Sequence, residues 1–158
     1  MRKFELAAIL AALLAAPAAL AQESGTEAQS SQMPDLSILP QGCQDAIQQS
    51  GMPGMMQGMD MSGMMGSMEG MGEAQQASMQ AMMKMNVPMM AAHTIEDPDL
   101  AFHCGMIAHH AGAIAMAEVE LQYGDDEQSK AMAQQIIDAQ GPEIEEMTAW
   151  VEENTDQQ

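Results

Sequence analysis

The chain has 158 residues, with 23 acidic side chains against four basic ones, and its formal net charge is −19 at pH 7. A protein with this charge repels nucleic acids and anionic lipid, so binding to either is excluded, whereas metal cations are attracted. Hydrophobic residues make up 47% of the chain, but 21 residues are methionine and only four are aromatic. We therefore do not expect a large, well-packed core.

Residues 1–21 have the pattern of a secretory signal peptide. Arg2 and Lys3 precede an alanine- and leucine-rich run, and small residues lead up to Ala21. The apolar run is too short to span a membrane, and no later stretch is expected to be long enough. We therefore predict cleavage after Ala21, no membrane span, and a mature chain in the periplasm or outside the cell.

Cys43 and Cys104 are the two cysteines of the chain. In an oxidising compartment an intramolecular disulfide between them is the default expectation. The alternative is that Cys104 is a thiolate ligand of a metal ion.

Residues 22–72 precede the main helical region. Residues 22–34 are small and polar, which predicts a flexible tether, and a short helix is expected near residues 37–49, after Pro40. Residues 51–72 are rich in methionine and glycine. This composition disfavours both helix and strand, so we predict an arm without fixed structure whose removal leaves the helical domain folded.

The arm has a composition suited to soft metal ions. Thioethers are soft, neutral donors that select Cu(I) over hard cations. The clustered methionines predicted to capture Cu(I) are Met55, Met56, Met59, Met61, Met64 and Met65. The alternative is an adaptable hydrophobic or oxidation-buffering tail.

Three helices are predicted in the domain of residues 73–155. The first begins at Glu73 and is expected to kink at Pro88 or to end near Asn86. Asp97 and Pro98 are typical of a helix start, which predicts a long helix from Pro98 to Tyr123 that Gly124 ends.

The last predicted helix runs from Glu127 to Glu153, with Asp125 or Asp126 as its N-cap. Gly141 and Pro142 are expected to kink or break it. The short turn at Gly124 makes the last two helices antiparallel neighbours, and the fold class is therefore an all-α bundle of three to four helices.

Three of the four histidines lie between Phe102 and Leu121. At about 100° per residue, His103 and His110 share an inward face, and Met106 lies between them at spacings of three and four. These side chains are close enough to converge on one ion. Mixed imidazole and thioether donors suit copper, whereas Zn(II) more usually recruits thiolate or carboxylate.

His109 lies on a neighbouring stripe with Met116, two turns further along the helix. Because His109 and His110 point about 100° apart, one ion cannot easily bind both. We therefore predict two adjoining half-sites, each of which needs donors from elsewhere.

The residues of this helix also fit two alternatives to metal binding. Histidine on an apolar face is often a hydrogen-bonded core residue, and methionine at helical spacing is often core. Catalysis is not indicated, because nucleophilic arrangements and the Glu-x-x-His pairs of di-iron bundles do not occur. We therefore expect that the protein is not an enzyme.

Two segments resemble the DUF305 family, which includes the CopM-like periplasmic copper-binding proteins. They are MIAHHAGAIAMA at residues 106–117 and AQQIIDAQGPEIEEMTAW at residues 133–150, and the resemblance covers about residues 97–153. It implies a ferritin-like helical bundle that binds copper outside the cytoplasm without turnover. The residues that match the family pattern are Met106, His109, His110, Met116 and Met147.

The sequence thus predicts an exported protein that sequesters or chaperones copper, or confers resistance to it. Cu(I) is the expected ion, with Cu(II) and Ag(I) as alternatives, and no organic cofactor is expected. Met147 and the arm would complete the half-sites, and other periplasmic copper-handling proteins are the expected partners. The alternative is a metal-free helical module that binds a protein or scavenges oxidants.

Overall fold

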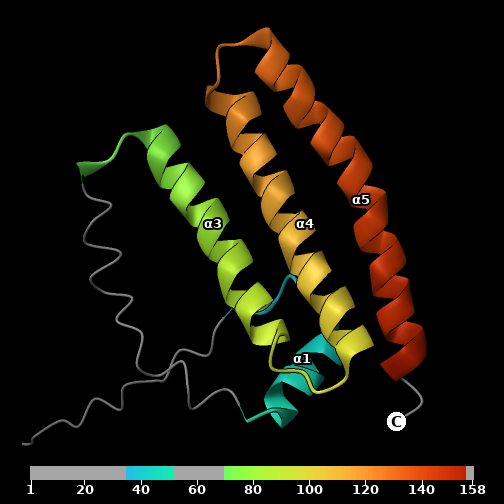
Figure 1. Cartoon of the computed structure of the whole chain (residues 1–158). Coiled ribbons are helices and arrows are strands. Elements are labelled where there is room, and N and C mark those ends of the chain that lie inside the picture. Colours follow the sequence, from blue (N-terminus) through green and yellow to red (C-terminus); the bar gives the residue numbers. More distant parts are fainter. Residues whose placement is uncertain (1–34, 52–69, 156–158) are drawn as a thin grey trace, which may run out of the picture. The chain divides into compact units, whose positions relative to one another are not determined.

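The computed structural model describes residues 35–51 and 70–155. These residues form four helices and no strand, so the predicted all-α bundle is confirmed (Figure 1). The helices are α1 (Gln41–Gln49), α3 (Glu73–Ala92), α4 (Pro98–Tyr123) and α5 (Glu127–Thr155). The predicted signal peptide, the tether at residues 22–34 and the arm methionines at residues 55–65 lie outside the described residues.

Helix α4 is the centre of the bundle. It packs against α3 on one side and against α5 on the other, so the three long helices lie side by side (Figure 1). The short helix α1 contacts all three and is joined to α4 by a disulfide between Cys43 and Cys104, whose Cα atoms are 5.7 Å apart. The expected pairing is therefore present, and Cys104 has no free thiolate to offer a metal ion.

The core lies where α1 meets the three long helices. It is built from aliphatic and small side chains, in keeping with the few aromatic residues of the chain. Its buried members are Leu39, Cys43, Ile47, Ala91, Ala92, Ile95, Leu100, Cys104, Ile107, Ala108 and Val151.

Local signals set the ends of α4 and the start of α5. The Asp97 carboxylate accepts a hydrogen bond from the Leu100 backbone N–H at 2.8 Å, and Pro98 is the first helical residue. Gly124 follows the last residue of α4 with extended backbone (φ −70°), so it does not use the left-handed conformation typical of such glycines. Asp126 accepts from the Ser129 N–H at 2.7 Å at the start of α5.

The two internal prolines do not end their helices. Helix α3 continues through Pro88 to Ala92, so the expected end near Asn86 is wrong. Helix α5 continues through Gly141 and Pro142, so the expected break there is also wrong. Packing overrides the local propensity: Pro88 is fully buried, and α5 has buried residues on both sides of its Gly–Pro pair.

A side-chain contact joins the end of α1 to the end of α3. The Ser50 hydroxyl lies 2.7 Å from that of Thr94, so α1 ends beside the end of α3. The first residue of α3 lies one helix length away, about 30 Å. Residues 52–69 lie outside the described residues, so the expectation that the arm can be removed while the domain stays folded remains a prediction.

Helix α4 is long and apolar enough to cross a membrane on length and composition, with a mean hydropathy of 1.2 in its most apolar window. The expectation that no later stretch is long enough is therefore wrong. The core helix of a soluble protein passes the same test, and α4 here packs between α3 and α5. The absence of a membrane span stays a prediction.

Candidate metal centre

Two contacts fix how α4 lies against α5. The His110 Nε2 atom lies 2.6 Å from Glu143 Oε2, and the His103 ring stacks on Trp150 with centroids 3.8 Å apart and planes 2° apart. The two histidines are seven residues apart on α4, and their partners Glu143 and Trp150 are seven residues apart on α5. Both contacts therefore fit the same antiparallel alignment of the two helices. In this register Met106 is level with Met147. We call these six residues the α4/α5 seam.

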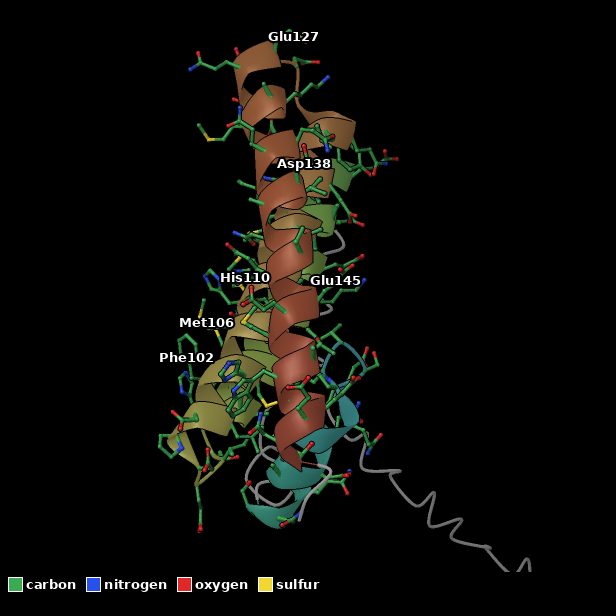
Figure 2. The ribbon with its side chains drawn as sticks, turned by 90° about the vertical axis from the view of Figure 1, so that its right-hand side faces the viewer. Phe102, Met106, His110, Glu127, Asp138 and Glu145 are labelled. Atoms are coloured by element: carbon green, nitrogen blue, oxygen red, sulfur yellow. A yellow bond between two sulfur atoms is a disulfide. The ribbon has the colours of Figure 1, made fainter. Side chains whose placement is uncertain are left out.

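Figure 2 shows how the α4 residues of the seam are placed. Phe102, Met106 and His110 follow one another along one edge of α5, and Glu145 lies at the opposite edge. Met106 is half-buried, and Met147 is half-buried against the core cluster. Two thioethers therefore lie between two imidazoles.

His110 is the buried polar residue of the seam, with 8% of its surface exposed. Because a carboxylate only accepts, Nε2 donates its proton to Glu143. The other ring nitrogen, Nδ1, is buried and has no hydrogen-bond partner. In the neutral ring this nitrogen holds a lone pair, which is the donor a metal ion requires.

A second buried acceptor lies close to His110 along the seam. Gln140 Oε1 is buried without a hydrogen-bond partner, about one turn of α5 before Glu143. Buried polar atoms in proteins nearly always have a partner, so His110 Nδ1 and Gln140 Oε1 are two acceptors that could receive a cation or a proton donor.

His103 is oriented by its neighbours on both faces. Its Nδ1 atom lies 2.8 Å from the Asp99 carbonyl oxygen and therefore donates to it, which leaves the lone pair on Nε2. Phe102 meets the same ring edge-on at 5.4 Å, opposite a stacked Trp150. The ring is therefore held in place without use of Nε2.

His109 and Met116 lie apart from this seam. His109 is exposed, although its ring centroid is only 5.8 Å from that of His110, and Met116 is 39% exposed. Phe102, His109 and Met116 point to the side of the bundle roughly opposite Cys104 and α1. We call this side the open face.

The structure therefore brings together four of the predicted ligands and separates two. His103, Met106, His110 and Met147 line the α4/α5 seam, whereas His109 and Met116 lie on the open face. The predicted arm ligands, Met55 to Met65, lie outside the described residues. In the part of the chain that is described, no cluster of three or more His, Cys, Asp or Glu side chains is placed to hold a metal ion.

Glu143, Trp150 and Gln140 were missed from the sequence. The sequence does contain a signal for this alignment. Residues 103, 106 and 110 are spaced by three and four, and residues 143, 147 and 150 are spaced by four and three. Reversed spacings on two antiparallel helices place the members of each set at matching levels. Reading that signal requires the register between the helices, which only the structure supplies.

The fold and the seam define an all-α bundle protein with imidazole and thioether side chains along the contact between two antiparallel helices. The chain belongs to the DUF305 family, described as a domain of unknown function, whose sequence model matches residues 14–151. The resemblance seen in residues 97–153 is thus confirmed at the level of the family. A comparison with curated proteins finds no match.

Proposed function

We propose that this protein binds Cu(I) outside the cytoplasm, to sequester it or pass it on, and that the α4/α5 seam is a principal site. The Nδ1 atom of His110 and the sulfurs of Met106 and Met147 are the proposed ligands, with His103 Nε2 as a fourth donor. The copper ion is cargo, and no reaction is assigned to the protein.

One observation carries this proposal: the buried, unpartnered Nδ1 atom of His110. Metal-binding histidines usually donate their other ring N–H to a carboxylate or carbonyl, which fixes the tautomer and makes the free nitrogen more basic. Glu143 holds His110 in this way, and the Asp99 carbonyl does the same for His103. Both rings are thus prepared to present a lone pair.

The neighbouring donors favour Cu(I) over other ions. Thioether sulfur is a soft ligand that binds Cu(I) and Ag(I) well and binds hard cations poorly. Cu(II) and Ag(I) remain the alternatives to Cu(I). The strongly acidic chain would raise the local concentration of any cation.

Export and the arm belong to the same proposal. A disulfide is compatible with a periplasmic or secreted location, which we propose together with a signal peptide at residues 1–21. The arm methionines Met55, Met56, Met59, Met61, Met64 and Met65 would capture Cu(I) first and exchange it with the firmer seam. A CopM-like role, with other periplasmic copper-handling proteins as partners, completes the proposal.

The test is titration of the mature chain with Cu(I) against a competing chelator, read by the fluorescence of Trp150. Because Trp150 is the single tryptophan and stacks on His103, Cu(I) in the seam should quench it. The double variant Met106→Leu and Met147→Leu should weaken the quenching phase by at least tenfold. The matched control, Met90→Leu and Met132→Leu, changes exposed methionines and should match the wild type. No Cu(I) binding by the wild type would sink the proposal.

A second candidate, a metal-free module that docks a protein, is favoured by the exposure of Phe102 (60%) on the open face. Binding of a protein partner that is unchanged by copper removal and lost in Phe102→Ser would support it. Loss of that binding in the Met106 and Met147 variant, with Phe102 intact, would favour the copper site instead.

A further inference from the structure

Two contacts also fix how α3 lies against α4. Met85 lies directly over Gly112, where a Cβ atom would overlap its side chain, and the Ala92 Cβ lies 3.9 Å from where a Cβ on Gly105 would be. The glycines are seven residues apart on α4, and their partners are seven apart on α3. One antiparallel register therefore holds along the α3/α4 seam.

This register brings three methionines of α3 to the His109 half-site. Met89 is level with Ala108, next to His109, and Met82 is level with Ala115, next to Met116. Met85 lies between them over Gly112. Met82, Met85 and Met89 are spaced by three and four, so their side chains follow one another along α3.

None of these methionines is fully buried: Met82 is exposed, Met85 is half-buried over Gly112, and Met89 is half-buried with one side against the core. On α3, Ala91 is fully buried on the side of α1, and Met82 and Met89 are roughly opposite it around the helix. Met82 is 44% exposed, and His109, two turns away along the same face, is exposed too. Met82 is therefore not a core methionine, and its sulfur is accessible.

A surface depression leads toward this cluster from the start of α3. Its lining includes Met71, Met79 and Met82, so sulfur atoms continue from the end of the methionine-rich segment to the cluster. A soft ion that reaches Met71 would therefore meet thioethers along the whole outer side of α3.

We propose that Met82, Met85 and Met89 of α3 form a second Cu(I) site with His109 and Met116 of α4. The site is thioether-rich, with one imidazole, and takes Cu(I) or Ag(I) in preference to Cu(II) or Zn(II). It rests on the proposed copper function but not on the α4/α5 seam. Because the His109 and His110 rings are 5.8 Å apart, the two sites are neighbours across α4.

The test compares two triple variants of the full mature chain. Met82→Leu, Met85→Leu and Met89→Leu keep the apolar bulk and remove the sulfurs. The control, Met79→Leu, Met83→Leu and Met90→Leu, changes α3 methionines outside the cluster. We expect the first variant to lose one equivalent of tightly bound Cu(I) in chelator competition, with the quenching of Trp150 unchanged, and the control to lose none.

The outcomes separate this site from the proposed function. Unchanged stoichiometry in the first variant, with Trp150 still quenched, overturns the second site and leaves the seam standing. No binding by the wild type overturns both.

A measurement on the wild type removes any dependence on how the variants fold. With ¹³C-labelled methionine methyl groups, Ag(I) should shift the signals of Met82, Met85, Met89 and Met116. Shifts confined to Met106, Met147 and the arm would overturn the proposal.

Discussion

The two ring nitrogens of His110 have different surroundings. Nε2 is bonded to Glu143 at 2.6 Å, and Nδ1 is buried without a partner. A carboxylate on one nitrogen orients the ring and makes the other nitrogen a better donor. At the scale of single residues, the pair of His110 and Glu143 is therefore the feature on which copper affinity should depend most.

Glu143→Gln should weaken Cu(I) binding at the seam by about 10- to 100-fold, the usual effect of removing such a partner. The Gln side chain can still accept from Nε2, and Glu143 is 56% exposed, so the fold should persist. Chelator competition read by Trp150 fluorescence is the measurement. Glu145→Gln, on the opposite edge of α5, is the matched control (Figure 2). Equal affinities for the two variants would contradict the role given to Glu143.

Residue-level prediction from the sequence was uneven. The spacing of His103, Met106 and His110 predicted a shared side of one helix, and the family pattern added Met147. Glu143 could not be predicted, because its role depends on the register between α4 and α5. Helical spacing alone does not distinguish a buried side chain from one that faces a neighbouring helix, so the position of the α3 methionines beside His109 could not be predicted for the same reason.

At the scale of the helices, close approach of α3 to α4 depends on Gly112. Gly112→Ala should destabilise the protein by about 1–3 kcal/mol, because the new methyl group would overlap Met85. Gly105→Ala, one contact further along the same seam, has ordinary contact distance to Ala92 and should stabilise α4 by about 0.5–1 kcal/mol. Denaturant unfolding of both variants tests this. A loss of stability in both, or in neither, would count against the register.

The start of α5 should depend on pH. The backbone N–H of Ser129 donates to the Asp126 carboxylate and lowers its pKa below the ordinary value of 3.8. A lowered pKa in the folded state means that this stabilisation is present above the unfolded pKa and is lost as pH falls through the folded pKa.

Asp126→Ala should therefore lower the melting temperature at neutral pH. The difference from the wild type should shrink as the pH falls below about 4, where the unfolded carboxyl takes up its proton. Thermal unfolding followed by circular dichroism at both pH values measures it. A difference that stays constant down to pH about 2 would show that the cap does not act through its charge.

Helix bounds were predicted where local chemistry sets them and missed where packing does. Asp97, Pro98 and Gly124 mark the ends of α4 by capping and backbone preference, and the helix has those ends. At Pro88 and at the Gly141–Pro142 pair the expected alternatives were a kink or an interruption, and the interruption does not occur. Buried residues on either side of each proline hold α3 and α5 continuous, and a sequence pattern does not contain that packing energy.

At the scale of the whole molecule, the disulfide joins α1 to the centre of the bundle. The variant Cys43→Ala and Cys104→Ala should be less stable by about 2–5 kcal/mol, because a long loop is no longer closed in the unfolded chain. Denaturant unfolding measures the loss. Because the α4/α5 seam does not involve the disulfide, its Cu(I) affinity should be unchanged in this variant. If reductant left the unfolding free energy of the wild type unchanged, the stabilising role of the disulfide would be contradicted.

The helical class and the antiparallel pairing of α4 with α5 were predicted from the sequence, whereas the position of α3 against α4 was not. The order of helices follows from local signals, whereas their placement follows from contacts such as Met85 over Gly112. The position of α5 gives the two adjacent histidines different surroundings, because α5 covers His110 and leaves His109 on the open face.

The measurement that tests the central claim most directly is a ¹⁵N NMR spectrum of the histidine rings during Cu(I) addition. Cu(I) is diamagnetic, so each ring nitrogen can be followed to saturation. The Nδ1 signal of His110 should shift strongly on binding, while Nε2 keeps its proton and its bond to Glu143. An unchanged Nδ1 signal at saturating Cu(I), or a shift confined to Nε2, would contradict a copper site in the α4/α5 seam.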